Sequence, residues 1–260
     1  MRIALGLSYN GSGYEGWQSQ LSGNTIQDRL EHALGQFTAQ QFRVNCAGRT
    51  DAGVHGLMQV VHFDTALDRD EASWVRGTNA FLPRDIAVQW ARHMPDDFHS
   101  RGSAMARRYA YVVLESPVRP SVEAGRVGWV YRPMDGAAME RAAAHLVGEH
   151  DFSSFRAAQC QAKSPIKTLT RITVSQRGPY WRFEFEANAF LHHMIRNIMG
   201  CLLSVGQGAH SPEWILEVLA ARNRDAAAPT FSPDGLYFMG PVYEDRYALP
   251  ASAPAYDWLP

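Results

Sequence analysis

Cysteine is scarce in this chain of 260 residues, with only Cys46, Cys160 and Cys201. Because they are odd in number and far apart, and because no C-x-x-C pair occurs, the sequence predicts neither a disulfide framework nor a cysteine zinc site. Long apolar runs are also lacking, so no membrane-spanning helix is expected. The short apolar stretch at the N-terminus turns polar at once, unlike a secretory signal peptide. We therefore expect a cytoplasmic globular protein.

Lysine is almost absent: of 25 basic residues only Lys163 and Lys167 are lysines, and the rest are arginines. The formal net charge of −1 argues mildly against a nucleic-acid partner. Arginine, however, presents a planar fork that binds phosphate bidentately and stacks on bases. An arginine-lined groove on a nearly neutral protein is one interpretation, and a genome-wide composition bias is the other.

The first half of the chain has the order β-α-β-β-α-β, which is the ferredoxin-like arrangement. Thr25 is expected to cap the first helix, since Asp28 stands three residues later and apolar residues then recur on one helical face. Alternating or β-branched stretches predict the strands. The expected elements are a strand at 2–9, a helix from 26, strands at 42–46 and 58–63, a helix at 71–79 and a strand at 86–90.

The same order recurs in the second half, without sequence identity between the halves. The expected elements are a strand at 104–114, a helix at 139–146, strands at 166–174 and 181–187, a helix at 190–206, a short helix after Pro212 and a strand at 236–242. We therefore predict an α+β fold of two ferredoxin-like (RRM-like) halves, residues 1–100 and 101–247, with antiparallel sheets side by side and a central cleft. Residues 248–260 are expected to form a tail.

A glycine-rich segment between the second and third strands is the strongest candidate for chemistry. It reads GRTDAGVHG from Gly48 to Gly56, with one carboxylate, Asp51, in the middle. Arg49 lies on the same face in an extended chain, and a neighbouring guanidinium favours the ionised form of a carboxylate. Asp51 is thus suited to act as a nucleophile or base rather than as a proton donor. On spacing alone, a structural turn with a surface ion pair is the favoured explanation of these residues.

The nine residues as a whole resemble the active-site motif of the tRNA pseudouridine synthase A family. Other stretches are similar to further blocks of that family: YNGSGYEGWQSQ with NTIQDRLEHAL, FHSRGSAMARRYAYVV, CQAKSPIKTL, FLHHMIRNIMG and PDGLYF. The resemblance thus runs nearly end to end; Asn10 and Ser12 stand where the family more often has Asp and Thr.

This resemblance implies the pseudouridine-synthase fold and a catalytic role for Asp51. It further implies isomerisation of uridine in the anticodon stem-loop of tRNA, with the target base flipped out of its stack. Tyr109 would stack on the flipped uracil, Leu236 would pack against it, and Arg49 would face the RNA. The implied partners are tRNA and a second copy of the chain in a homodimer, with no membrane and no DNA. No cofactor is needed, since the reaction involves neither redox nor group transfer.

Arg196 would pair with Asp51 according to the resemblance, and the residues around it give independent support. Its neighbours on the expected helix are apolar, and a buried arginine without a partner is costly. His192 and His193, expected on the same helix, point about 100° apart as adjacent helical residues. With no H-x-x-x-H or H-E-x-x-H spacing nearby, we predict no metal site.

Several interpretations of these residues stay open. Tyr109 and Tyr111 share one face of the expected strand, so periodicity does not choose between them as a core tyrosine and a stacking partner. Arg107 shares that face and Arg108 does not, so at most one of the two would reach the same site. Two other functions compete with the isomerase: a catalytically silent RNA-binding protein of the same fold, and a hydrolase with Asp51 as nucleophile and His55 as its acid or base.

Overall fold

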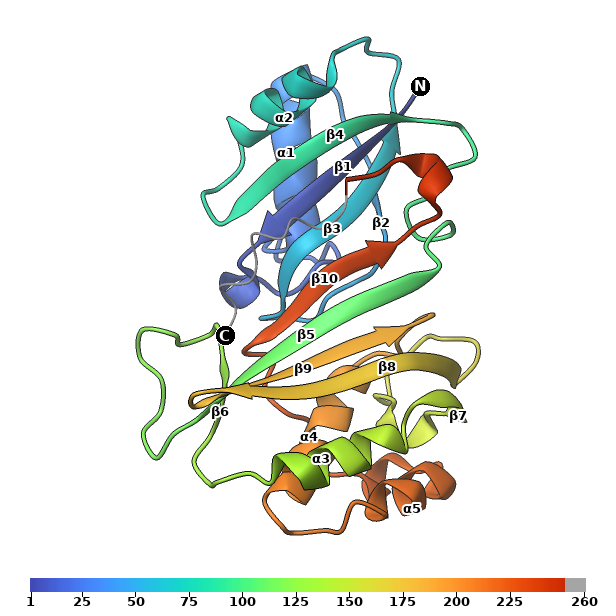
Figure 1. The fold of residues 1–260 in the computed structure, drawn as a ribbon. Coiled ribbons are helices and arrows are strands. Elements are labelled where there is room, and N and C mark those ends of the chain that lie inside the picture. Colours follow the sequence, from blue (N-terminus) through green and yellow to red (C-terminus); the bar gives the residue numbers. More distant parts are fainter. Residues whose placement is uncertain (251–260) are drawn as a thin grey trace. The chain divides into compact units, whose positions relative to one another are not determined.

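The computed structural model describes residues 1–250, in which the chain forms two compact units (Figure 1). Among the described residues, the first unit contains 1–107 and 237–250, and the second contains 108–236. The expected boundaries were 1–100 and 101–247, with the last strand in the second half. The expected tail, 248–260, lies mostly outside the described residues.

The first unit follows the predicted β-α-β-β-α-β order. Its elements are β1 (Arg2–Tyr9), α1 (Ile26–Thr38), β2 (Asn45–Cys46), β3 (His55–Asp64), α2 (Glu71–Asn79) and β4 (Ile86–Met94). The strand order is β4-β1-β3, with β2 on β3, and these pairs are antiparallel. One further strand, β10 (Leu236–Val242), joins β3 in parallel through Tyr237 and Phe238. The sheet is therefore mixed, whereas antiparallel sheets were expected.

Helices α1 and α2 pack on one face of this sheet (Figure 1). Their apolar residues share one core with those of β1 and β3, because the helical and strand periodicities put these side chains on the facing surfaces. The predicted cap of α1 is confirmed: the Thr25 side chain accepts a hydrogen bond from the Asp28 amide at 3.2 Å. Capping satisfies one of the unpaired amides of the first turn.

The second unit has the strand order β5-β9-β8-β7, with a short β6 parallel to β5. Its strands are β5 (Ala106–Glu115), β6 (Gly128–Val130), β7 (Gly148–Asp151), β8 (Ile166–Arg177) and β9 (Tyr180–Ala187), and its helices are α3 (Gly136–Ala144), α4 (Met194–Gly206) and α5 (Trp214–Ala221). Burial alternates perfectly along β9, as predicted for a half-buried strand. The α+β class is thus confirmed. None of the described helices is long and apolar enough to span a membrane.

Two differences between predicted and observed element starts bear on the candidate site. Helix α4 begins at Met194, not at 190, because His193 adopts a left-handed conformation (φ 60°) that an α-helix does not tolerate. His192 therefore lies outside the helix, and the argument from helical spacing between the two histidines does not apply to them. Strand β3 begins at His55, so the end of the glycine-rich segment is already sheet.

Candidate functional site

Asp51 opens a tight turn at the centre of the glycine-rich segment. The Val54 amide donates to the Asp51 carbonyl at 3.1 Å, which closes a four-residue turn. Gly53, the third residue of that turn, has φ +81°. A positive φ at this position is typical of a type II turn and favours glycine. The turn leaves the Asp51 side chain half-buried.

The N-terminal loop, residues 10–24, supports this turn through main-chain hydrogen bonds. The Trp17 amide donates to the Thr50 carbonyl at 3.0 Å, and the Gly53 amide donates to the Tyr14 carbonyl at 3.3 Å. Gly16 has φ +89°, and a Cβ there would lie 2.7 Å from the Thr50 oxygen. Only glycine allows the two backbones to approach so closely. The sequence prediction treated this loop as a separate block, and its glycines were the only signal of the packing.

His55 has a structural role at the start of β3. It is 2% exposed, and its Nδ1 accepts a hydrogen bond from the Gly11 amide at 3.1 Å. Its ring stacks on Tyr237, with 4.6 Å between centroids. Because one ring nitrogen is held by a backbone amide, His55 anchors the N-terminal loop to β3. This arrangement gives no support to the hydrolase interpretation.

The three arginines that the sequence singled out, Arg49, Arg107 and Arg108, have different surroundings. Arg49 is exposed, as an RNA-facing side chain would be. Arg107 donates to the backbone carbonyls of Arg101 at 2.6 Å, Ala104 at 3.0 Å and Ala47 at 3.4 Å. These contacts tie the end of the first unit to the strand that leads into the glycine-rich segment. Arg108 belongs to the second unit and is half-buried.

The cysteine nearest the turn is not a competing nucleophile. Burial raises the pKa of the Cys46 thiol to about 11, although Arg49 and Arg101 act in the opposite direction. A thiol in that state is protonated at neutral pH, and the thiolate is the reactive form.

In the second unit, the two tyrosines of β5 have different surroundings. Tyr109 is 8% exposed and meets Phe190 edge-on, with 5.2 Å between ring centroids. Tyr111 is fully buried, and its hydroxyl donates to the Ser232 carbonyl. Periodicity alone did not separate these two residues. The structure gives Tyr111 a core role and leaves Tyr109 as the predicted stacking residue.

Arg196 is held by Phe231, and Leu236 lies at the end of the same segment, residues 231–236. The Arg196 Nε donates to the Phe231 carbonyl at 2.9 Å, and the Phe231 amide donates back to the Arg196 carbonyl at 3.1 Å. Leu236 is 3% exposed and follows Gly235, whose φ is +81°. A Cβ at Gly235 would lie 2.2 Å from the Val112 oxygen, so this position requires glycine. Arg49 and Asp51 thus belong to the first unit, and Tyr109, Arg196 and Leu236 belong to the second.

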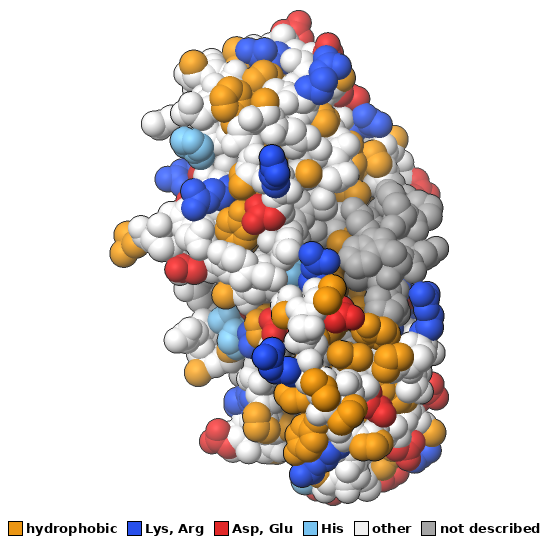
Figure 2. Space-filling view, turned by 90° about the vertical axis from the view of Figure 1, so that its left-hand side faces the viewer, with side chains coloured by type: hydrophobic (Ala, Val, Ile, Leu, Met, Phe, Trp, Pro, Cys, Tyr) orange, Lys and Arg blue, Asp and Glu red, His pale blue; other side chains and the backbone are white. Residues whose placement is uncertain are grey.

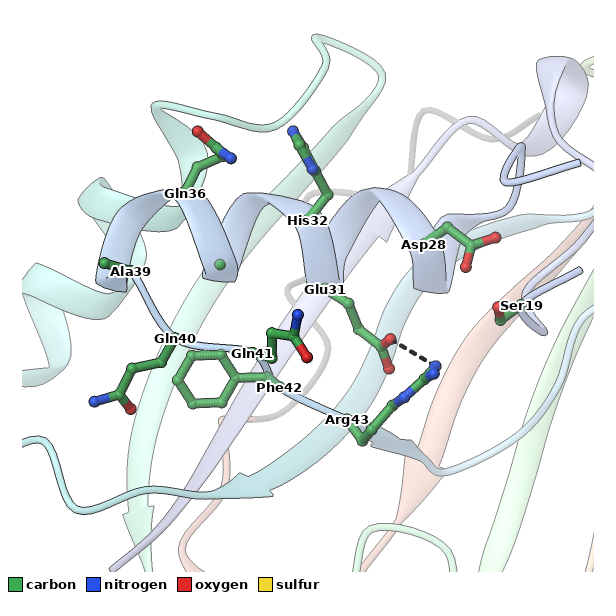
Figure 3. A pocket seen from close by; sticks show the side chains of 11 residues that line it. Ser19, Asp28, Glu31, His32, Gln36, Ala39, Gln40, Gln41, Phe42 and Arg43 are labelled. Atoms are coloured by element: carbon green, nitrogen blue, oxygen red, sulfur yellow. Dashed lines mark hydrogen bonds and ion pairs between the residues drawn. The ribbon is translucent and has the colours of Figure 1, made fainter. Parts of the chain in front are cut away.

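An open groove of about 780 Å³ lies along α1 and the chain that follows it (Figure 3). None of the predicted site residues lines it. Glu31 accepts from Arg43 at 3.2 Å and from the Val44 amide at 3.0 Å. Its carboxylate is therefore used to fasten the chain after α1 to the helix, and the groove is not part of the candidate site.

Comparison with known proteins gives a consistent result. A family model described as tRNA pseudouridine synthase matches residues 7–101 and 142–244. Proteins described as tRNA pseudouridine synthase A are 78% identical in Polaromonas sp. (strain JS666 / ATCC BAA-500) and 66% identical in Delftia acidovorans (strain DSM 14801 / SPH-1), with all of both chains covered in each case.

Among solved structures, a crystal structure of a Cbf5-Nop10-Gar1 complex is similar at 12% identity and a TM-score of 0.35. The match covers 77% of this chain and 45% of that chain.

Proposed function

This chain belongs to the tRNA pseudouridine synthase family, and from that premise we propose that it isomerises uridine to pseudouridine in the anticodon stem-loop of tRNA with Asp51 as its catalytic carboxylate. The observation that carries the assignment of Asp51 is the turn itself. A half-buried carboxylate stands at its first position, and glycines and backbone bonds support the turn on both sides.

The reaction breaks the bond between ribose C1′ and uracil N1, turns the base and rejoins it through C5. The proton on C5 is released and N1 gains one, so atoms and electrons balance without a redox partner. The chemistry asks for one group that attacks or deprotonates the nucleoside, and for a hold on the detached uracil. Asp51 provides the first, by attack on C1′, by addition to the uracil ring or by removal of a ribose proton.

The remaining roles follow the same proposal. Tyr109 stacks on the flipped uracil, a contact worth about 1–3 kcal/mol per base, and Leu236 packs against the base. Arg196 pairs with Asp51 and orients its carboxylate. The half-buried position of Arg196 among the apolar residues of α4 supports this pairing, because a guanidinium away from water favours a carboxylate partner. Arg49, exposed beside Asp51, contacts the RNA. Since its substrate is tRNA, we place the enzyme in the cytoplasm.

The test of the proposal is tritium release from tRNA transcripts labelled at uracil C5, with wild type, Asp51→Asn and Asp68→Asn compared. Asp68 is an exposed carboxylate of the same unit and serves as the matched control. We expect release, mapped to the anticodon stem-loop, by wild type and Asp68→Asn only. Release by Asp51→Asn would remove Asp51 from the mechanism. Binding of tRNA without release by any variant would favour the silent RNA-binding protein.

We also propose that the enzyme is a homodimer, joined through the segment 117–132 of the second unit. Four large apolar side chains of this segment are exposed: Val118 (70%), Val122 (84%), Trp129 (38%) and Tyr131 (58%). Figure 2, viewed from the side of this segment, shows apolar side chains gathered in the lower part of the surface. Such patches mark interaction sites, and tryptophan, tyrosine and arginine are enriched in interfaces.

Sedimentation velocity of the purified protein tests the dimer. Val122→Asp combined with Tyr131→Ser is expected to sediment as a monomer, because it puts a charge into an apolar contact and removes an aromatic ring from it. Leu21→Asp, at an exposed leucine of the first unit, is the control and should leave the dimer intact. A wild-type monomer at micromolar concentration would reject the dimer, and a double variant that stays dimeric would reject this interface.

A further inference from the structure

Gln59 is an unusual residue for the centre of β3. Its side chain is 0% exposed, and its neighbours along this face of the strand, Leu57 and Val61, are apolar. Removing an amide from water without hydrogen-bond partners costs about 1–3 kcal/mol in proteins. A glutamine at this position therefore needs partners of its own inside the protein.

Its main partner is the backbone of Gly48, the first residue of the glycine-rich segment. The Gln59 Nε2 donates to the Gly48 carbonyl at 2.6 Å, and the Gly48 amide donates to the Gln59 Oε1 at 3.4 Å. The Gln59 side-chain amide thus uses both its NH₂ group and its oxygen to bind the main chain of Gly48.

The register of β2 on β3 explains why this pairing occurs at Gly48. Asn45 pairs with His62 and Cys46 with Val61, and the Ala47 amide then donates to the Val60 carbonyl at 2.8 Å. The next pair in this register is Gly48 with Gln59. Strand β2 has ended there, and the Gln59 side chain replaces the main-chain ladder for one more residue.

A second contact extends this hold to the residue just before Asp51. The Tyr9 hydroxyl lies 2.9 Å from the Thr50 Oγ1 and also interacts with the Gln59 side chain. The side chains of Tyr9, Thr50 and Gln59 are all buried, so these contacts are shielded from water. The chain is therefore fixed at Gly48 and at Thr50, on either side of Arg49.

We propose that Gln59, with Tyr9, is a positioning residue for Asp51: it fixes the entry of the chain into the catalytic turn. This proposal rests on the catalytic role of Asp51 proposed above. Gln59 does not touch the reacting atoms in this account. It acts through Gly48 and Thr50, and its loss lets the carboxylate move away from its productive position.

The experiment compares Gln59→Met with Asn79→Leu, each close in shape to the residue replaced. Asn79 makes the same kind of two-way clamp on a backbone residue of the first unit. Its Nδ2 donates to the Val88 carbonyl at 2.9 Å, and the Val88 amide donates to its Oδ1 at 2.8 Å. Both variants lose two hydrogen bonds to main chain, but only Gln59→Met loses them at the glycine-rich segment.

We expect both variants to melt at a lower temperature than wild type. Below the melting range, kcat for tRNA should fall about tenfold to a hundredfold in Gln59→Met only, because a displacement of about 1 Å has effects of this size. KM should stay within about twofold of wild type. Amide hydrogen exchange of the peptide 46–54 should be faster in Gln59→Met and unchanged in Asn79→Leu. Gln59→Glu, which puts a carboxylate against the Gly48 carbonyl, should not restore kcat.

Wild-type kcat in Gln59→Met, or an equal fall of kcat in Asn79→Leu, would overturn the proposal and make Gln59 a residue of stability alone. Failure of the proposed function looks different, because wild type itself would then bind tRNA without releasing tritium. In that case the positioning role falls together with the function on which it rests.

Discussion

Lowering the pH is expected to destabilise the first unit through one residue, His62. This side chain is 3% exposed, and its Nδ1 accepts from the Ser100 amide at 3.2 Å. The Ser100 hydroxyl donates to the Asn45 carbonyl at 2.8 Å. Protonation of Nδ1 would break the bond from the Ser100 amide and put a charge into a buried site. Burial lowers the pKa of His62 from 6.5 to about 4, with further lowering by His99 and Arg2 and a smaller opposing effect of Asp64.

The sign and size of the effect follow from these two values. The unfolded chain takes up the proton near pH 6.5 and the folded protein only near pH 4, so the stabilisation by neutral His62 is complete above about pH 6.5. It is lost as the pH falls toward 4. A difference of about 2.5 pKa units corresponds to about 3 kcal/mol of unfolding free energy. This is a large share of the stability of an ordinary domain, which is about 5–15 kcal/mol.

Urea unfolding at several pH values between 7 and 4.5 measures this loss. Asp28, Asp64 and Asp151 have pKa values lowered below 3.8, so their contributions are lost only at more acidic pH. The comparison variant is His62→Asn, whose Oδ1 replaces Nδ1 as an acceptor but does not titrate. It loses the ring contacts with His99 and Phe98 and should be less stable at pH 7. Its unfolding free energy should nevertheless change less with pH, and a pH dependence parallel to wild type would refute the reasoning.

Two further predictions concern the glycine-rich turn and the base. Gly16→Ala should cost about 1–3 kcal/mol of unfolding free energy and reduce tRNA turnover, because its Cβ would press on the Thr50 carbonyl. The control is Gly23→Ala, where φ is also positive (+66°) but the space around the Cβ is open. It should cost only the backbone strain and leave turnover unchanged. Equal effects of the two substitutions in urea unfolding and turnover assays would contradict this prediction. Tyr109→Ala should weaken tRNA binding by about 1–3 kcal/mol through lost stacking, while Tyr109→Phe should bind as wild type does. The control is Tyr111→Phe, which loses a hydrogen bond to the Ser232 carbonyl and should lower Tm without changing the Kd for tRNA. If Tyr109→Ala binds tRNA with the Kd of wild type, Tyr109 does not belong to the site.

Local patterns were enough to predict most elements, because their periodicity directly reflects burial. The alternation in β9 and the Thr25 cap of α1 are examples. Strand β1 was predicted from an alternating sequence, but its burial does not alternate: Ile3 to Leu7 are all buried. Strand β7, Gly148–Asp151, was missed because its four residues are polar and its pairing with β8 gives no local signal. The left-handed His193 was missed for a related reason, since nothing in its sequence neighbourhood distinguishes it from a helical residue.

The candidate site was predictable only where a motif carried it. GRTDAGVHG pointed to Asp51, but its supports come from residues far away in the chain. Tyr9 contacts the Thr50 hydroxyl, Gln59 binds the Gly48 carbonyl, and Gly16 packs on the Thr50 backbone. These contacts depend on tertiary packing, which sequence spacing does not reveal. For the same reason, His55 could not be recognised as an anchor of the N-terminal loop before its bond to Gly11 was seen.

The parallel pairing of β10 with β3 has a consequence for the order of synthesis. His55 and Gly56 pair with Tyr237 and Phe238, which are synthesised only after all of the second unit. Before Tyr237 and Phe238 are made, His55 and Gly56 have no partner strand from β10. Unpaired strand edges invite association with other chains. Contacts between residues so distant in sequence also form slowly. The strand that carries Gln59 and follows the glycine-rich turn therefore gains its β10 partner late, and the first unit stays unfinished until β10 has been made.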